Sequence, residues 1–232
     1  GATAGAENRN VTAGSSNILC TGGVGGTRLG AMTINSANNV TEVAGLTTAS
    51  LVQSAGTGTT LLTGAVNTNT AAGVQLTTNN ITQNGTLTTT GNGVVTFTNA
   101  GSLTISAAGD LFLDGAFTQN GTGAVSTAGD ISTTNDNISF LRAVTLTGPV
   151  ALSAGNGNIT FSTTLDGASS LTANSVGTTT FNGVVGGITP LSALTTDAGG
   201  STSVNGGLIR TTGSQTYGDA LTLSTPTTLA AS

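Results

Sequence analysis

The feature that most constrains this chain is a short apolar pattern that returns about every 21 residues. "NISF" (residues 137–140) comes back as "NITF" (residues 158–161), with Val-x-Leu pairs between them. In the C-terminal half, three sets of apolar positions advance in step: Ile138, Ile159 and Thr179; Val144, Leu165 and Val185; Val150, Leu171 and Leu191. The steps are 21 and then 20 residues in each set, and a fixed period of this length indicates a repeat architecture.

The same interval extends in both directions with some loosening. Val74 and Leu76 precede Val95 and Phe97 by 21 residues, and Phe181 leads to Val204 after 23. It also relates three earlier positions to three later ones: Phe117 to Ile138, Val125 to Leu146, and Ile131 to Leu152. Residues 46–232 are therefore predicted to form one continuous repeat domain. Residues 1–45 are expected to be an irregular segment or the first coils.

Within one period the apolar residues come in i, i+2 pairs, such as Ile138/Phe140, Val144/Leu146 and Val150/Leu152. This alternation is typical of short strands, since successive side chains of a strand point to opposite faces. The pattern predicts an all-β parallel β-helix, a β-solenoid with about three short strands per coil of roughly 20–23 residues. Phe140, Phe161 and Phe181 would stack inside it. An antiparallel β-sandwich is the alternative, but it does not explain three sets that advance together.

Composition supports a narrow, stacked fold. The chain is 36% hydrophobic but only 6% charged and 3% aromatic, with 36 glycines. Small residues fit tight corners, and like charges repeated in register would repel. The net charge of −5, with no lysine, argues against nucleic-acid binding. No apolar run approaches the ~20 residues of a membrane-spanning helix, so membrane insertion is not expected.

The stretch from Gly129 to Leu229, which begins "GDISTTNDNISFLRAVTLTGPVALSAGNGNITF", resembles the repeats of very large bacterial β-strand-repeat surface proteins, similar in style to filamentous haemagglutinin-like exoproteins. The resemblance covers roughly residues 85–230. It implies export, a right-handed parallel β-helix and a stalk, filament or adhesive role outside the cell. It also implies that the chain is a piece of a longer one. No catalytic motif is transferred with it.

Few residues offer chemistry. The chain has no histidine, so histidine-dependent catalysis and metal sites built on histidine are excluded. Cys20 is expected to be a buried or semi-exposed thiol. "GGVGGTRLG" (residues 22–30) lacks the Lys-Ser/Thr of a P-loop and is interpreted as a corner loop. Asp110 and Asp130 open the matching phrases "AGDLF" and "AGDIS" and are expected on neighbouring coils. Solvated corner residues, a bound cation and an acid/base pair each remain open there.

Two surface functions are weighed. Ice binding needs a regular threonine array, but beyond Ser139, Thr160 and Thr180 the outward threonines are not expected to repeat coil after coil. Carbohydrate binding needs exposed aromatic rings, and the six phenylalanines and Tyr217 mostly fall at predicted inward positions.

The favoured hypothesis is an extracellular structural or adhesive β-solenoid, without catalytic residues, cofactor or metal. It would associate end to end with itself or with further repeats, and surface glycans are candidate partners. The alternative is a carbohydrate-binding or carbohydrate-active β-helix. A phage or pilus-like fibre component would share the architecture.

Overall fold

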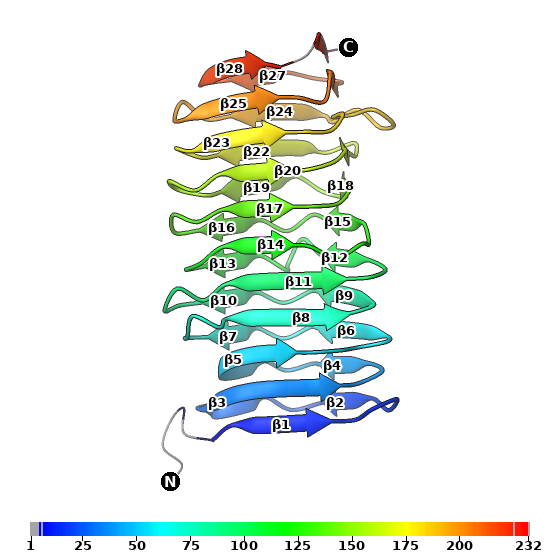
Figure 1. Ribbon diagram of the computed structural model, residues 1–232, viewed down its shortest axis with the longest axis vertical. Helices are drawn as coiled ribbons and strands as arrows, with labels where there is room; N and C mark the ends of the chain where they lie inside the picture. The colour runs from blue at the N-terminus through cyan, green and yellow to red at the C-terminus, as the bar shows by residue number, and fades with distance from the viewer. Residues whose placement is uncertain (1–4, 6, 225, 232) are drawn as a thin grey trace.

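The computed structural model describes residues 5, 7–224 and 226–231, and these residues form a parallel β-solenoid of about 11 turns (Figure 1). Every strand pairing is parallel, and the described residues contain no helix. In Figure 1 the chain climbs from the N-terminus to the C-terminus while the front strands run from left to right, which is the sense of a right-handed coil. The predicted fold class is confirmed.

Each coil contributes strands to three faces. The first face contains β1 (Arg9–Thr12), β3 (Val24–Ser36), β5 (Leu46–Gln53), β8 (Val74–Thr78), β11 (Val95–Asn99), β14 (Phe117–Gln119), β17 (Ile138–Phe140), β20 (Ile159–Phe161), β23 (Thr178–Phe181), β25 (Ser201–Val204) and β28 (Ala220–Leu223). At the inter-strand spacing of roughly 4.8 Å, these coils make a rod about 50 Å long.

The second face contains β2 (Ile18–Cys20), β4 (Val40–Glu42), β6 (Thr59–Leu62), β9 (Asn80–Gln83), β12 (Leu103–Ile105), β15 (Val125–Thr127), β18 (Val144–Leu146), β21 (Leu165–Asp166), β26 (Leu208–Thr211) and β29 (Thr228–Ala231). Single bridges through Val185 join β21 to β26.

The third face contains β7 (Val66–Thr68), β10 (Leu87–Thr89), β13 (Leu111–Leu113), β16 (Ile131–Thr133), β19 (Val150–Ser153), β22 (Ser170–Asn174), β24 (Ala193–Thr196) and β27 (Gln215–Tyr217). The first parts of β3 and β5 also belong to it, because these two long strands bend around a corner. Strands β1 to β4 lie within residues 1–45 and pair with their neighbours in the same faces as the later strands.

The core is a set of vertical columns made by the inward residues of successive coils. Ile138 lies in register with Ile159 and then Thr179, and Phe140 with Phe161 and then Phe181, as predicted. The inward residues are almost fully buried, and burying a large apolar side chain contributes about 1.5–3 kcal/mol. The backbone ladder and these columns hold the rod together.

Two predicted alignments are wrong because corner lengths vary. Leu171 pairs with Leu194, not Leu191, since the extended loop after Val185 delays the next strand, and Leu191 instead bridges to Thr211. Val125 pairs with Val144, not Leu146. The reason is a shorter corner: residues 120–124 connect β14 to β15, whereas only residues 141–143 connect β17 to β18.

The corners of neighbouring coils are tied by asparagine side chains. Asn137 Oδ1 accepts the N–H of Asn158 at 2.8 Å, and Asn158 Oδ1 accepts the N–H of Thr178 at 2.7 Å. Asn17 and Asn39 make the same contacts at another corner, to the N–H groups of Asn39 and Thr59. These bonds satisfy backbone donors that leave the strand ladder at a turn. They explain why asparagine opens both "NISF" and "NITF".

Candidate functional site

Asp110 and Asp130 lie on adjacent coils at the corner that precedes β13 and β16, where the matching phrases placed them. Asp110 Oδ1 accepts the N–H of Asp130 at 2.9 Å, and Asp130 Oδ1 accepts the N–H of Ala151 at 2.7 Å. Each carboxylate therefore ties its own coil to the next, as the asparagines do elsewhere. In the described part of the chain, no group of three or more His, Cys, Asp or Glu residues could hold a metal ion.

Cys20 is half-buried and lies in register with the buried Glu42 of the next coil. Burial raises the pKa of the Cys20 thiol, and the negative charge of Glu42 raises this pKa further. The Glu42 carboxylate accepts the N–H groups of Gly45 and Gly64, the latter at 3.0 Å. The surroundings of Cys20 thus favour the protonated thiol over the nucleophilic thiolate.

The glycine-rich segment 22–30 is mainly strand rather than the expected corner loop. Its residues from Val24 onward belong to β3, with a register shift between Val24 and Leu29 where the strand turns the corner. Glycine is needed there for close backbone approach: at Gly25, with φ +86°, an added Cβ would lie 2.0 Å from the carbonyl oxygen of Thr47. The segment is a bent part of the wall.

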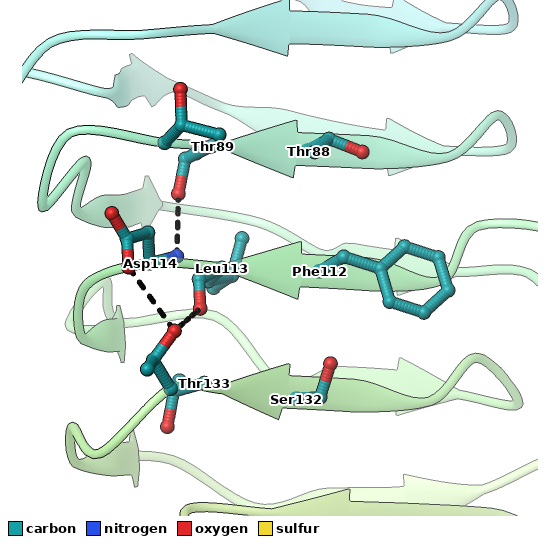
Figure 2. Close-up of a pocket in the computed structure, with 9 residues that line it drawn as sticks. Thr88, Thr89, Phe112, Leu113, Asp114, Ser132 and Thr133 are labelled. Atoms are coloured by element: carbon teal, nitrogen blue, oxygen red, sulfur yellow. Dashed lines mark hydrogen bonds between the residues drawn. The ribbon is translucent and has the colours of Figure 1, made fainter.

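The outward side of β13 is unlike the rest of the third face, because it presents an aromatic ring. Phe112 is 49% exposed, whereas each of the other five phenylalanines is at most 2% exposed. Its neighbours Leu111 and Leu113 point inward. In register with Phe112, Thr88 lies on the preceding coil and Ser132 on the following one. Figure 2 shows the ring standing between these two smaller side chains.

Two aspartates flank β13, one just before the strand and one just after it. Asp110 and Asp114 lie two residues before and two residues after Phe112, and Asp114 lines the same depression as the ring. Figure 2 shows the Phe112 ring leaning away from Asp114. The ring therefore shares its side of the wall with one carboxylate, that of Asp114, and with hydroxyl groups on the coils above and below.

Asp114 is held in place by three hydrogen bonds. Its N–H donates to Thr89 Oγ1 at 3.0 Å (Figure 2). Its carboxylate Oδ2 accepts the N–H of Asn92 at 2.9 Å, and Oδ1 accepts the hydroxyl of Thr134 at 3.1 Å. The Asn92 N–H, and then the Thr134 hydroxyl, lower the pKa of the Asp114 carboxyl. Asn92 has φ 59°, and no other non-glycine residue in the described ranges has a positive φ.

The third face has a shallow depression of about 410 Å³, which is lined by residues 88–90, 112–114 and 132–134 (Figure 2). The lining offers one apolar ring, hydroxyl groups and a carboxylate, and it includes no lysine or arginine. Sequence reasoning did not single out this site, although one signal was present. Phe112 stands between Leu111 and Leu113, out of phase with the inward pair.

The first face carries a longer column of hydroxyl groups than the sequence predicted. The expected run of Ser139, Thr160 and Thr180 continues in both directions on this face. Seven successive coils place a hydroxyl residue at the same outward position: Thr96, Thr118, Ser139, Thr160, Thr180, Ser203 and Thr222. This face is polar and uncharged at that position over these coils.

Comparison with protein-family models, with curated proteins and with solved structures gives no match to this chain. Among the described residues, no helix is long and apolar enough to cross a membrane.

Proposed function

We propose that this chain is a segment of an extracellular structural or adhesive β-solenoid, a surface stalk, filament or fibre that associates end to end. The observation that carries the proposal is the state of the last described coil. Leu221 and Leu223 lie in register over Thr202 and Val204, on the inward side of the wall. Val204 is fully buried, but Leu223 is 44% exposed.

An inward layer of this kind offers apolar surface to which another coil can add. Covering Leu221 and Leu223 would remove apolar surface from water and would pair the open edge of β28. Further repeats of a longer parent chain would supply such a coil, and so would the first coil of a second copy. The low charge of the chain favours this stacking, since close coils with few charges repel one another little.

Two features support a role outside the cell: the rod shape, and the resemblance of residues 85–230 to the repeats of bacterial surface proteins. Repeats of one coil add length at constant width, which suits a stalk or fibre. The proposal includes no catalysis: the chain has no histidine or lysine, and the carboxylates of Asp110, Asp114 and Asp130 each accept hydrogen bonds from backbone N–H groups. Binding partners are other solenoid coils and surface glycans.

The assembly is tested by sedimentation velocity and electron microscopy over a range of protein concentrations. We expect rods whose lengths are multiples of about 50 Å, the length of one chain at roughly 4.8 Å per coil. The double variant Leu221→Lys/Leu223→Lys should remain a single rod, because charge replaces the apolar layer. Thr222→Lys, which adds charge to the same strand on the outward side, is the matched control and should still associate.

Two results would overturn this proposal. One is a wild-type chain that stays monomeric at every concentration, and the other is a double variant that associates as well as Thr222→Lys. The cellular location has its own test: antibodies against the chain should label intact cells of the source organism, and labelling that requires lysis would contradict export.

A further inference from the structure

We propose that the outward side of β13 is a binding subsite for an uncharged sugar ring of a polysaccharide, with Phe112 as the stacking platform. This inference rests on the proposed adhesive function, and it adds the class of ligand that the rod would bind. It draws on the position of Phe112, on the carboxylate beside it and on the charge of the surrounding residues.

Phe112 is a large exposed ring between two small residues. The outward positions in register on either side are Thr88 and Ser132, and all three residues line one shallow depression. A ring left about half exposed in the middle of a rod retains apolar surface that a ligand would cover. The face of a phenyl ring carries partial negative charge and attracts the weakly positive C–H groups on one side of a sugar ring.

A carboxylate supplies part of the polar half of the site. Asp114 follows Phe112 by two residues and lines the same depression. A carboxylate has about four acceptor positions, and Asp114 uses two of its own for Asn92 and Thr134. The remaining positions accept hydroxyl protons from a sugar that lies on the ring.

The Asp114 carboxylate is positioned before any ligand arrives. It is held by the N–H of Asn92 and the hydroxyl of Thr134. Groups fixed in this way lose little conformational entropy when they bind. The positive φ of Asn92 contributes here, since this backbone conformation belongs to the residue whose N–H reaches the Asp114 carboxylate.

The charge of the site selects among sugars. The depression contains Asp114 and no lysine or arginine, and the chain as a whole carries −5. Phosphorylated, sulfated and carboxylated sugars would be repelled. Hydroxyl groups of Thr88, Thr90, Ser132 and Thr134 line the same depression as the ring, and they match the hydroxyl groups of an uncharged sugar, as donors and as acceptors.

The test is affinity electrophoresis in gels that contain dextran, mannan or xylan as uncharged polysaccharides, with hyaluronan as the anionic comparison. The background is the Leu221→Lys/Leu223→Lys variant, so that retardation does not depend on end-to-end assembly. We expect at least one uncharged polysaccharide to retard this protein and hyaluronan to leave it unaffected. Phe112→Thr should weaken the retardation by on the order of tenfold, as loss of a central aromatic anchor does, and Phe112→Tyr should preserve it.

Ile188→Thr is the matched control, because Ile188 is 87% exposed in a loop and lies outside the depression. This variant should be retarded like its background. Far-UV circular dichroism and thermal unfolding should show that Phe112→Thr keeps the fold, since the residue packs against no inward column.

Three results would overturn the inference: no retardation by any uncharged polysaccharide, equal retardation of Phe112→Thr and its background, or binding to oligolysine that disappears with moderate salt. The last result would identify a site for cationic groups. None of these results bears on the proposed end-to-end assembly. A wild-type chain that fails to assemble would likewise not change the result expected for polysaccharide binding.

Discussion

Phe140 and Phe161 stack face to face inside the solenoid, with ring centroids 5.3 Å apart and ring planes 11° apart. Phe181 continues the stack at 5.4 Å and 7°. Phe117 meets Phe140 at 57° instead, because Phe117 lies in register with Ile138 and therefore belongs to the neighbouring column. The rings are therefore parallel in the three successive coils that each place a phenylalanine in the same column.

Removal of the middle ring of this stack should be costly. Phe161→Ala leaves a cavity between Phe140 and Phe181, and the expected loss of unfolding free energy is about 3–5 kcal/mol. Phe112→Ala, on the outward side, should change it by less than about 0.5 kcal/mol. Urea unfolding followed by far-UV circular dichroism measures both, and equal losses would contradict the inward column.

The asparagine corner can be tested at a single hydrogen bond. Asn158→Ala removes the acceptor of the Thr178 N–H, so the amide hydrogen exchange of Thr178 should accelerate and unfolding free energy should fall by about 0.5–1.5 kcal/mol. Asn158→Asp keeps an acceptor oxygen and should keep Thr178 protected. An unchanged exchange rate in Asn158→Ala would show that the side chain does not hold this corner.

Tyr217 should lose its proton at a higher pH than an exposed tyrosine does. Burial raises the pKa of Tyr217 to about 12, whereas an exposed tyrosine titrates near ~10. The folded pKa is the higher one, so this group's contribution to stability is complete below about pH 10 and is lost as the pH rises toward 12.

The chain has one tyrosine and no tryptophan, so tyrosinate absorbance reports this residue alone. The same titration in urea should return the midpoint to ~10. A midpoint near 10 in the folded protein would contradict the burial of Tyr217.

Cys20 should react slowly with iodoacetamide. Its raised pKa lowers the thiolate fraction at neutral pH, so the midpoint of the rate against pH should lie above the ~8.5 of an exposed cysteine. Glu42→Gln removes the neighbouring negative charge and should lower that midpoint, while the buried amide keeps one acceptor oxygen for the glycine N–H groups. A midpoint unaffected by Glu42→Gln would leave burial as the whole cause.

The residues that sequence reasoning placed well are those inside the coil. Ile138, Phe140 and Val144 repeat because each inward position must be apolar in every coil, and the alignments of Ile138 and Phe140 were predicted correctly on both following coils. The errors at Leu191 and Val125 arose at corners. A corner gains or loses residues without changing the core, so the spacing of apolar residues does not determine its length.

The amino-acid sequence by itself determined that this chain winds into parallel coils, because alternating apolar residues that return every turn can be buried only by the turn above and the turn below. The tertiary structure alone decided which outward residues become neighbours. The neighbours Thr88 and Ser132 of Phe112, and the column of seven hydroxyl residues on the first face, come from three different coils or more. Outward side chains are under no packing constraint, so only the register of the folded coils brings them together.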